Sequence, residues 1–399
     1  MTFNKYKLWN IISKNIFQLH SVERVSNSCI EYNYSIQGYW KRLFNSDKLR
    51  IDFGIDVLQI PDSVLAIPLL GNILPISWIC DATIKLDYLD QNFFSCIDLV
   101  KKGYHNMYPN LEFLGKIEVK ELESNCPETN SYTSAMFFSA GVDSFSTFLN
   151  HKNESPLLIT LCGSDIPLDD KKGWAAMQER QRFMEKTYGC KSISIFSNFR
   201  TILNEGRLCK LVSSSGDKWW HGFQHGLAII CHAAPLSYKF GINNLYIASS
   251  FTSSLYKYVT CASAPSIDNN VQFVRTHTQH DDATRDRYDK VKHISDYHKK
   301  TGIVFPLHVC WTAAGGGNCS RCEKCTRTIL ALYACNEDPT LFGFNPELTS
   351  EQNVRSSCRT WQAYENSYKK TIEILNENYN HQSIAKWAKW ALDFHIDRP

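Results

Sequence analysis

Four cysteines in the C-terminal third of the chain have the type and spacing of metal ligands. They follow the pattern Cys310-x8-Cys319-x2-Cys322-x2-Cys325, so four of the 15 cysteines in 399 residues stand close together. Four thiolates at short spacings suit a tetrahedral zinc ion, and a set with no open position is structural rather than catalytic. The alternatives are unrelated buried thiols or a redox pair. We expect these cysteines to hold Zn²⁺.

A second motif, Ser139-Ala140-Gly141-Val142-Asp143-Ser144, lies directly after an apolar run and directly before a helical pattern. The backbone N–H groups of a small-residue turn and the positive end of a helix attract an anion such as phosphate. Ser139 and Ser144 can add hydroxyl donors. Asp143 has the wrong charge for direct phosphate contact, so we expect it to cap the helix or to act through Mg²⁺. An ordinary strand-to-helix turn is the alternative.

The segment from residue 132 to residue 248 alternates short apolar runs with amphipathic helical patterns. We expect strands at 135–138, 157–162, 192–196 and 245–248, with helices between them. This order predicts an α/β fold with a parallel sheet covered on both faces, in which ligands bind at the carboxyl ends of the strands. Gly163 and Asp165 follow the second strand, where a loop would meet an adenine or a ribose; a plain turn is the alternative.

Three regions are expected along the chain. Residues 1–128 are predicted to form a separate N-terminal α+β domain, with a helix capped by Asp90 and a strand within 111–122. The polar stretch 123–133 is the expected linker. Residues 129–345 then form the sheet domain with its cysteine cluster, and residues 346–399 form a C-terminal helical segment.

Composition and charge restrict the partners. The formal net charge is only +3, from 43 basic and 40 acidic side chains, and no run of like charge is present. This balance argues against a nucleic-acid partner and favours a small molecule or a protein. The apolar stretch 64–80 is broken by prolines and a glycine, so no membrane span is expected. Many cysteines without a secretion signal indicate a reducing compartment, so we expect a cytoplasmic protein.

The two motifs together resemble a known superfamily. The turn resembles the S-G-G-x-D-S signature of the PP-loop ATP pyrophosphatases, with Ala140 in place of one glycine. The cysteine spacing resembles that of the 7-cyano-7-deazaguanine synthases of queuosine biosynthesis, which belong to the same superfamily. The two motifs also occur in the same order. The resemblance covers roughly residues 130 to 335 and implies a Rossmann-like PP-loop domain.

The resemblance implies an ATP-dependent ligase. Such enzymes adenylate a carboxylate, here 7-carboxy-7-deazaguanine, and release pyrophosphate, after which a nitrogen nucleophile displaces AMP. Residues 139–144 would then bind ATP, with Asp143 and Ser144 catalytic and Mg²⁺ at the phosphates. Asp268 lies near the place of the base-binding loop of the synthases, and Arg327, just beyond the last cysteine, could reach a phosphate or a carboxylate.

The length of the chain leaves several functions open. About 130 residues precede the matched region, and an extra domain next to an adenylating centre could supply a second substrate or partner. This raises a resemblance to the synthase-like proteins of bacterial antiphage systems, where a deazaguanine would be joined to a protein amine. An amidating enzyme acting on a sugar or another carboxylate is one alternative, which would keep both motifs and change only the base-binding loop. A tRNA-modifying PP-loop enzyme would need a basic surface, and a binding module without activity would follow from a loop altered at Ala140.

Two further groups of side chains are expected to be structural. His221, His225 and His232 share one face of a predicted helix beside aromatic residues, and packing or hydrogen bonding is the expected role rather than metal binding. A second group of basic side chains is expected on a solvated helix face. These are Arg285, Arg287, Lys290 and Lys292.

Overall fold

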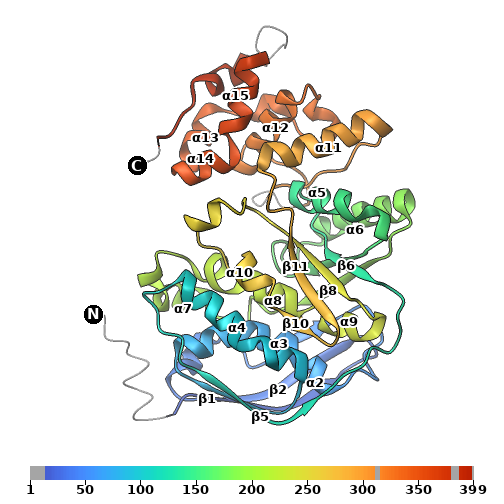
Figure 1. Cartoon of the computed structure of the whole chain (residues 1–399), viewed down its shortest axis with the longest axis vertical. Coiled ribbons are helices and arrows are strands. Elements are labelled where there is room, and N and C mark those ends of the chain that lie inside the picture. Colours follow the sequence, from blue (N-terminus) through green and yellow to red (C-terminus); the bar gives the residue numbers. More distant parts are fainter. Residues whose placement is uncertain (1–13, 311–314, 379–385, 398–399) are drawn as a thin grey trace.

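Eleven strands form one mixed sheet in the computed structural model, which describes residues 14–310, 315–378 and 386–397. The strand order is β10-β11-β9-β6-β7-β8-β3-β2-β1-β4-β5 (Figure 1). The strands are β1 Ile16–Arg24, β2 Cys29–Gln37, β3 Arg50–Asp52, β4 Thr83–Asp90, β5 Lys116–Glu123, β6 Ser134–Phe137, β7 Leu157–Cys162, β8 Ser192–Ser197, β9 Asn244–Ala248, β10 Gln272–Phe273 and β11 Thr276–Asp281.

The parallel half of the sheet contains the four strands expected from the apolar runs. Strands β11, β9, β6, β7 and β8 pair in parallel. Every residue of β7 is buried, because helices cover both faces of the sheet at this point. The α/β class predicted from the sequence is therefore confirmed.

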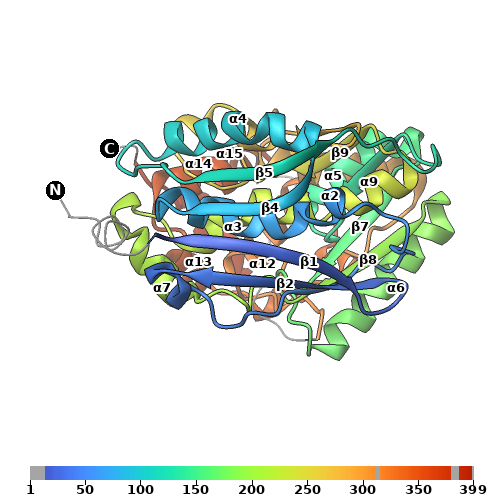
Figure 2. The same ribbon diagram turned by 90° about the horizontal axis from the view of Figure 1, so that it is seen from below.

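The N-terminal strands continue the same sheet. β3 pairs with β8 in antiparallel register, Ile51 opposite Ser197, and β2, β1, β4 and β5 follow (Figure 2). One hydrophobic core includes Phe17 and Ile84 of the N-terminal strands together with Ile159 of β7. The sequence predicts a separate domain for residues 1–128. In the structure, the described part of that region belongs to the same sheet and the same hydrophobic core as the region that follows it.

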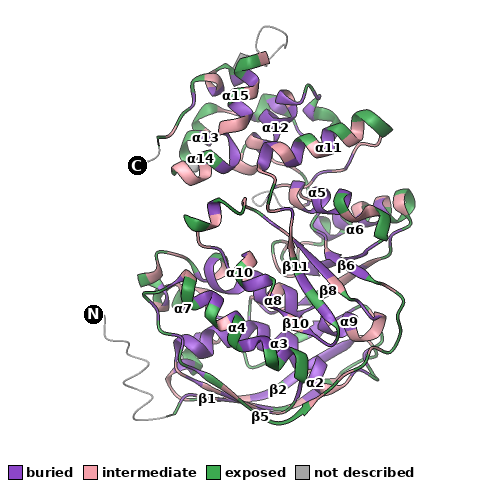
Figure 3. Ribbon diagram, in the orientation of Figure 1, coloured by how far each residue is buried: buried purple, intermediate pink, exposed green. Residues whose placement is uncertain are grey.

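A layer of helices lies between the N-terminal strands and the parallel strands (Figure 1). Its members are α2 Asp62–Leu65, α3 Ile67–Ile79, α4 Gln91–Met107, α8 His225–Cys231, α9 Ala234–Phe240 and α10 Pro265–Asp268. All residues of α3 are buried, as expected of a helix that is apolar on every side (Figure 3). The predicted cap of α4 is confirmed, since the Asp90 side chain accepts a hydrogen bond from the Phe93 N–H at 2.9 Å.

Helices α5 and α6 cover the opposite face of the parallel strands, α11 packs against α5, α12 packs against α11, and α13–α15 lie beyond them (Figure 1). Their bounds are α5 Val142–His151, α6 Lys171–Tyr188, α11 Arg287–Thr301, α12 Glu323–Ala334, α13 Glu351–Ser357, α14 Trp361–Ser367 and α15 Lys369–Asn378, and α7 spans Glu205–Leu211. Shorter turns are η1 Tyr39–Leu43, η2 Lys152–Glu154, η3 Ser213–Ser215, η4 Trp220–Gln224, η5 Leu255–Lys257, η6 Pro339–Phe342, η7 Pro346–Leu348 and η9 Lys386–Asp393. Among the helices of the described ranges, none combines the length and the apolarity needed to cross a membrane.

The shared core predicts that residues 129–399 do not fold alone. Removing residues 1–128 would expose the edge of β8 and the face of α8 that α3 covers. We expect that fragment to aggregate or to bind a hydrophobic dye, whereas the full chain unfolds cooperatively in urea. Cooperative unfolding of the fragment would show that the boundary at residue 128 separates independent domains.

Candidate functional site

A cavity of about 230 Å³ lies at the carboxyl ends of β6, β7 and β9. In α/β sheets this is the edge where ligands bind. Ser139, Gly141, Val142, Asp143 and Ser144 of the predicted turn line one part of it. Another part is apolar, with walls from Ile159, Leu161, Ile166, Trp174, Met177, Ile229 and Ile247. The predicted anion-binding turn therefore faces a real cavity.

The turn ends at the start of α5 without a capping side chain. Gly141 occupies the N-cap position, and no side chain accepts a hydrogen bond there. The Ser144 hydroxyl donates to the Gly141 carbonyl at 3.0 Å, and Ser139 Oγ lies 3.4 Å from Ser144 Oγ. The first N–H groups of a helix have no partner inside the helix. An anion in the cavity would meet these groups together with two hydroxyls.

Ala140 adopts the left-handed conformation that usually favours glycine, with φ +57°. Its carbonyl accepts a hydrogen bond of 2.7 Å from the His308 N–H, which fixes the turn against the chain before the cysteine cluster. The Ala140 side chain is buried in the core on the α5 side and is not part of the cavity wall. The substitution of alanine for glycine therefore strains the backbone by about 1–2 kcal/mol without narrowing the cavity.

Asp143 does not cap α5; it forms ion pairs with two buried cations. The Arg287 guanidinium pairs with both carboxylate oxygens, at 2.9 and 3.0 Å, and Lys290 Nζ lies 3.2 Å from Oδ1. Burial opposes ionisation of the carboxyl group, but the charges of Arg287 and Lys290 outweigh it and hold the Asp143 pKa well below its ordinary value. Asp143 therefore stays ionised and orients Lys290 together with Arg287, which lines the cavity.

Arg287 and Lys290 correct the expectation of a solvated basic face. Both are buried, whereas Arg285 and Lys292 are partly exposed and pair with nearby carboxylates. Arg287 and Lys290 share the buried face of α11 with Val291 and Ile294. The spacing of these four positions could have predicted that the two basic residues are buried. A basic residue that shares a helix face with core positions must meet a buried partner.

Helix α12 brings more positive charge to the cavity. Lys324, Arg327 and Thr328 line it, and burial lowers the pKa of Lys324. Arg327 pairs with Glu323 at 3.2 Å and donates to the Ser367 hydroxyl at 3.0 Å. In the described parts of the chain, Nε of Arg327 and Nε of Arg287 are buried without a hydrogen-bond partner. Arg327 is therefore placed as predicted, on the cavity rather than on the surface.

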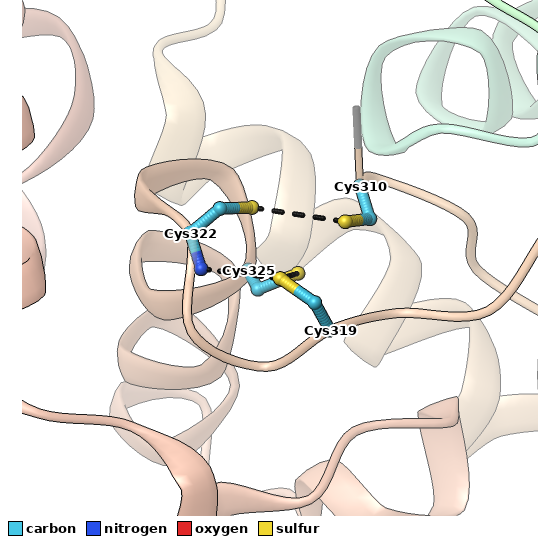
Figure 4. A group of neighbouring side chains, drawn as sticks. All are labelled: Cys310, Cys319, Cys322 and Cys325. Carbon is cyan, nitrogen blue, oxygen red and sulfur yellow. Dashed lines mark hydrogen bonds between the residues drawn. The ribbon is translucent and has the colours of Figure 1, made fainter. Parts of the chain in front are cut away.

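The four predicted metal ligands converge. Their sulfur atoms all lie within 4.8 Å of one another, and the Cys310–Cys322 and Cys319–Cys325 sulfur pairs are each 3.9 Å apart (Figure 4). A Zn–S bond of about 2.3 Å sets tetrahedral sulfurs about 3.8 Å apart, whereas a disulfide needs about 2.0 Å. The Cys322 N–H also donates to Cys319 Sγ at 3.2 Å. The cluster has the dimensions of a closed zinc site.

The cluster also fixes the start of α12. Cys322 is the N-cap of this helix, and Cys325 lies in its first turn. Because Lys324 and Arg327 belong to the same turns, a metal bound by the four thiols would set the position of both cations. Cys310 itself lines the cavity, and the metal would also act on the cavity through the backbone of α12.

Three further predicted residues differ in their placement. Asp165 lines the cavity. Gly163 does not line the cavity. It has φ +96°, and a Cβ there would lie 2.1 Å from the Ser197 carbonyl oxygen, so the glycine permits the loop after β7 to pack closely against the end of β8. Asp268 is fully buried outside the cavity wall, where its Oδ2 accepts from Ser263 Oγ at 2.7 Å and lies 2.7 Å from His280 Nδ1. Asp268 therefore does not line the cavity, which corrects the prediction that it contacts a substrate directly.

A magnesium ion fits Asp143 poorly on its own. Both carboxylate oxygens already face cations, so a second positive ion there would be repelled. A polyphosphate would supply the missing negative charge and would bring its own metal ion, as is usual for Mg²⁺. Asp143 is thus better suited to orienting Arg287 and Lys290 than to binding the metal.

Comparisons with known proteins leave the chain without an assigned family. No protein-family model matches it, no curated protein matches it, and no solved structure matches it. The site must therefore be interpreted from its own geometry.

Replacement of one cluster ligand tests the metal site. We expect Cys322→Ser to lose bound zinc and to lower the melting temperature, because three thiols hold zinc more weakly and α12 loses its anchor. Metal analysis and thermal unfolding measure both effects. The matched control is Cys335→Ser, a buried thiol at the other end of α12. Equal zinc content in the two variants would contradict the assignment.

The buried ion pair predicts that two basic residues of α11 contribute unequally to the free energy of unfolding. Arg287→Met should lower the free energy of unfolding by about 3 kcal/mol, because it leaves the Asp143 carboxylate without its bidentate partner. Lys292→Met should change it by less than about 0.5 kcal/mol, since that pair is exposed. Urea unfolding compares the two variants. Equal losses would mean that the Asp143 cluster does not stabilise the fold.

Proposed function

We propose that this chain is an ATP-dependent enzyme that adenylates a carboxylate, most specifically 7-carboxy-7-deazaguanine, and passes the acyl group to a nitrogen nucleophile. One observation carries the proposal. A single cavity at the carboxyl ends of parallel strands combines an uncapped helix start with the cations Arg287, Lys324 and Arg327. The resemblance of residues 139–144 to the PP-loop signature supports the phosphates of ATP as this anion.

The polar end of the cavity suits the departure of pyrophosphate. When a carboxylate attacks the α-phosphate of ATP, negative charge accumulates on the leaving pyrophosphate. The N–H groups at the start of α5 are donors for that charge, and the hydroxyls of Ser139 and Ser144 line the cavity and would turn from their present partners toward it. Preorganised donors of this kind each contribute about 3 kcal/mol to transition-state stabilisation. Arg287 is held in place for the same purpose by Asp143.

The apolar end of the cavity suits a flat fused ring. Trp174, Met177 and the isoleucines around them offer dispersion contacts to a deazaguanine or an adenine. Asp165, at the rim of this part, offers carboxylate oxygens to the N–H edge of a guanine-like base or to ribose hydroxyls. The division into a cationic end and an apolar end matches a substrate pair of triphosphate and heteroaromatic acid.

Pyrophosphate release tests the proposed reaction. The wild-type chain with ATP and 7-carboxy-7-deazaguanine should release pyrophosphate, and Asp143→Asn should reduce the rate at least about 100-fold because Arg287 and Lys290 lose their orienting charge. Asp289→Asn is the matched control, since Asp289 pairs with Lys370 away from the cavity.

Two outcomes would contradict the proposal. The first is absence of release by the wild-type chain with every carboxylate tested, including sugar acids. The second is retained release by Asp143→Asn. The mass of the product then identifies the acceptor: a nitrile or an amide forms with ammonia, whereas an adduct on another chain indicates a protein amine.

A further inference from the structure

Cys261 lies in the loop that follows β9, at the same sheet edge as the cavity. Ser250, at the start of this loop, is part of the cavity wall. The thiol is 4% exposed and belongs to a cysteine outside the zinc-type cluster. Nothing in the adenylation chemistry described above uses it.

Two imidazoles lie near this thiol. The Ala262 N–H, next in the chain to Cys261, donates to the His221 carbonyl at 2.8 Å, and both His221 and His225 favour the thiolate form of Cys261. His221 belongs to η4, a π-helical turn, and His225 begins α8 directly after it. Single π-turns of this kind are frequent at functional sites. The His221 side chain is 51% exposed, whereas His225 lines the cavity. The thiol thus lies between an imidazole at the solvent and an imidazole at the cavity.

Asp217 orients His221. Its carboxylate oxygens lie 3.0 and 3.2 Å from His221 Nδ1, which leaves the other ring nitrogen for Cys261. Thr260 Oγ1 donates to the same carboxylate at 2.7 Å, and the Tyr108 hydroxyl donates to it at 2.9 Å. A thiol, an imidazole beside it and a carboxylate behind the imidazole are the arrangement of an activated cysteine nucleophile.

The charges around the thiol support this arrangement. Burial raises the Cys261 pKa, but His221 and His225 outweigh it and lower the pKa to about 6. The hydrogen bond to Asp217 is the main reason that the His221 pKa rises to about 10. Tyr104, Tyr108 and Tyr256 also surround the thiol, and burial raises the pKa of each, so all three stay neutral. Cys261 and His221 therefore form a thiolate–imidazolium pair at neutral pH.

A metal site is the competing explanation for cysteine, histidine and carboxylate side chains. Within the described ranges, the ligand atoms of only one such group, the four cysteines of Figure 4, gather closely enough to share an ion. The groups around Cys261 are spaced for pairwise contacts instead. Covalent chemistry at the thiol fits this spacing better than metal binding.

We propose that Cys261 is an acyl acceptor: it takes the acyl group from the acyl adenylate as a thioester and then gives it to an amine. This inference rests on the proposed adenylation. The thiolate attacks the carbonyl carbon, a C–S bond forms, the C–O bond to AMP breaks, and AMP leaves as the anion. An amine then attacks the thioester, a C–N bond forms, the C–S bond breaks, and the amine proton passes to the departing sulfur.

The position of the thiol separates the two steps in space. The acyl adenylate would reach Cys261 past His225 from the cavity, and the amine would reach it past His221 from solvent. The amine acceptor therefore need not enter the ATP cavity. This geometry suits a primary amine on a large acceptor, such as a protein.

The N-terminal half of the chain holds the histidine-bearing turn in place. The Tyr104 hydroxyl donates to the Phe223 carbonyl at 2.9 Å, and Gln224 Nε2 donates to Asn72 Oδ1 at 2.9 Å. The Tyr108 ring also stacks on Phe223 with centroids 4.5 Å apart. Residues of α3 and α4 are thus positioning residues for the Cys261 centre.

The pH dependence of alkylation tests the activated thiol without any substrate. Iodoacetamide labelling of the full chain, followed peptide by peptide, should give a midpoint near pH 6 for Cys261. The exposed Cys126 is the internal reference for the efficiency of labelling. In His221→Gln and in Tyr108→Phe the Cys261 midpoint should rise. An ordinary midpoint for Cys261 in the wild-type chain would overturn the proposal.

Mass analysis of the intact chain tests the thioester itself. With ATP and 7-carboxy-7-deazaguanine but no amine, the acid-quenched wild-type chain should gain the mass of the acid less one water. Neutral hydroxylamine should remove this adduct, and Cys261→Ala should never form it while still releasing pyrophosphate in the first turnover. Cys126→Ala is the matched control. Pyrophosphate release without an adduct on Cys261 overturns the thioester alone, whereas absence of release in the wild-type chain overturns the adenylation on which it rests.

Discussion

The ion pairs of Asp143 connect the three segments on which the cavity depends. The carboxylate lies in the first turn of α5, Arg287 and Lys290 lie at the start of α11, and Lys290 also donates to the Ser249 carbonyl after β9. Buried charges are stable only when they are paired. One carboxylate therefore fixes both the anion-binding turn and the cations that face the same space. Loss of this pairing would leave two positive charges in a buried site and would separate α11 from the sheet.

The cysteine cluster acts on the same end of the cavity from the opposite side. It determines where α12 begins, and the first two turns of α12 carry Lys324 and Arg327. Each set of restraints also contributes to the cavity wall, through Asp143 and through Cys310. The Asp143 ion pairs and the cysteine cluster both determine the direction of charged side chains toward the cavity. A binding site keeps its geometry without a ligand in this way.

The sequence predicted those features of the structure that depend on residues close together in the chain. The wholly apolar run 157–162 became β7, Asp90 became a helix cap, and the four cysteines converged, because each of these patterns lies within one short stretch of the sequence. The burial of Arg287 was not predicted because its partner, Asp143, is 144 residues away. The left-handed backbone of Ala140 was likewise hidden, since a residue type does not state its φ.

The N-terminal half shows the same limit on a larger scale. Its strands alternate as a half-exposed sheet should, but a pairing of β3 with β8 depends on edges that no local pattern reveals. This N-terminal region positions the turn near Cys261, since Asn72, Tyr104 and Tyr108 form hydrogen bonds with residues in and next to that turn. The described residues before the turn at 139–144 therefore belong to the same structural unit as the cavity.

The central claim is that the cavity activates a carboxylate with ATP, and isotope exchange tests it most directly. With labelled pyrophosphate, ATP and 7-carboxy-7-deazaguanine, the full chain should return label to ATP only when the acid is present, because adenylation is reversible while the acyl adenylate stays bound. This exchange needs neither the acceptor nor Cys261. Failure of exchange with this acid and with other carboxylates, at ATP concentrations that saturate the protein, would contradict the account.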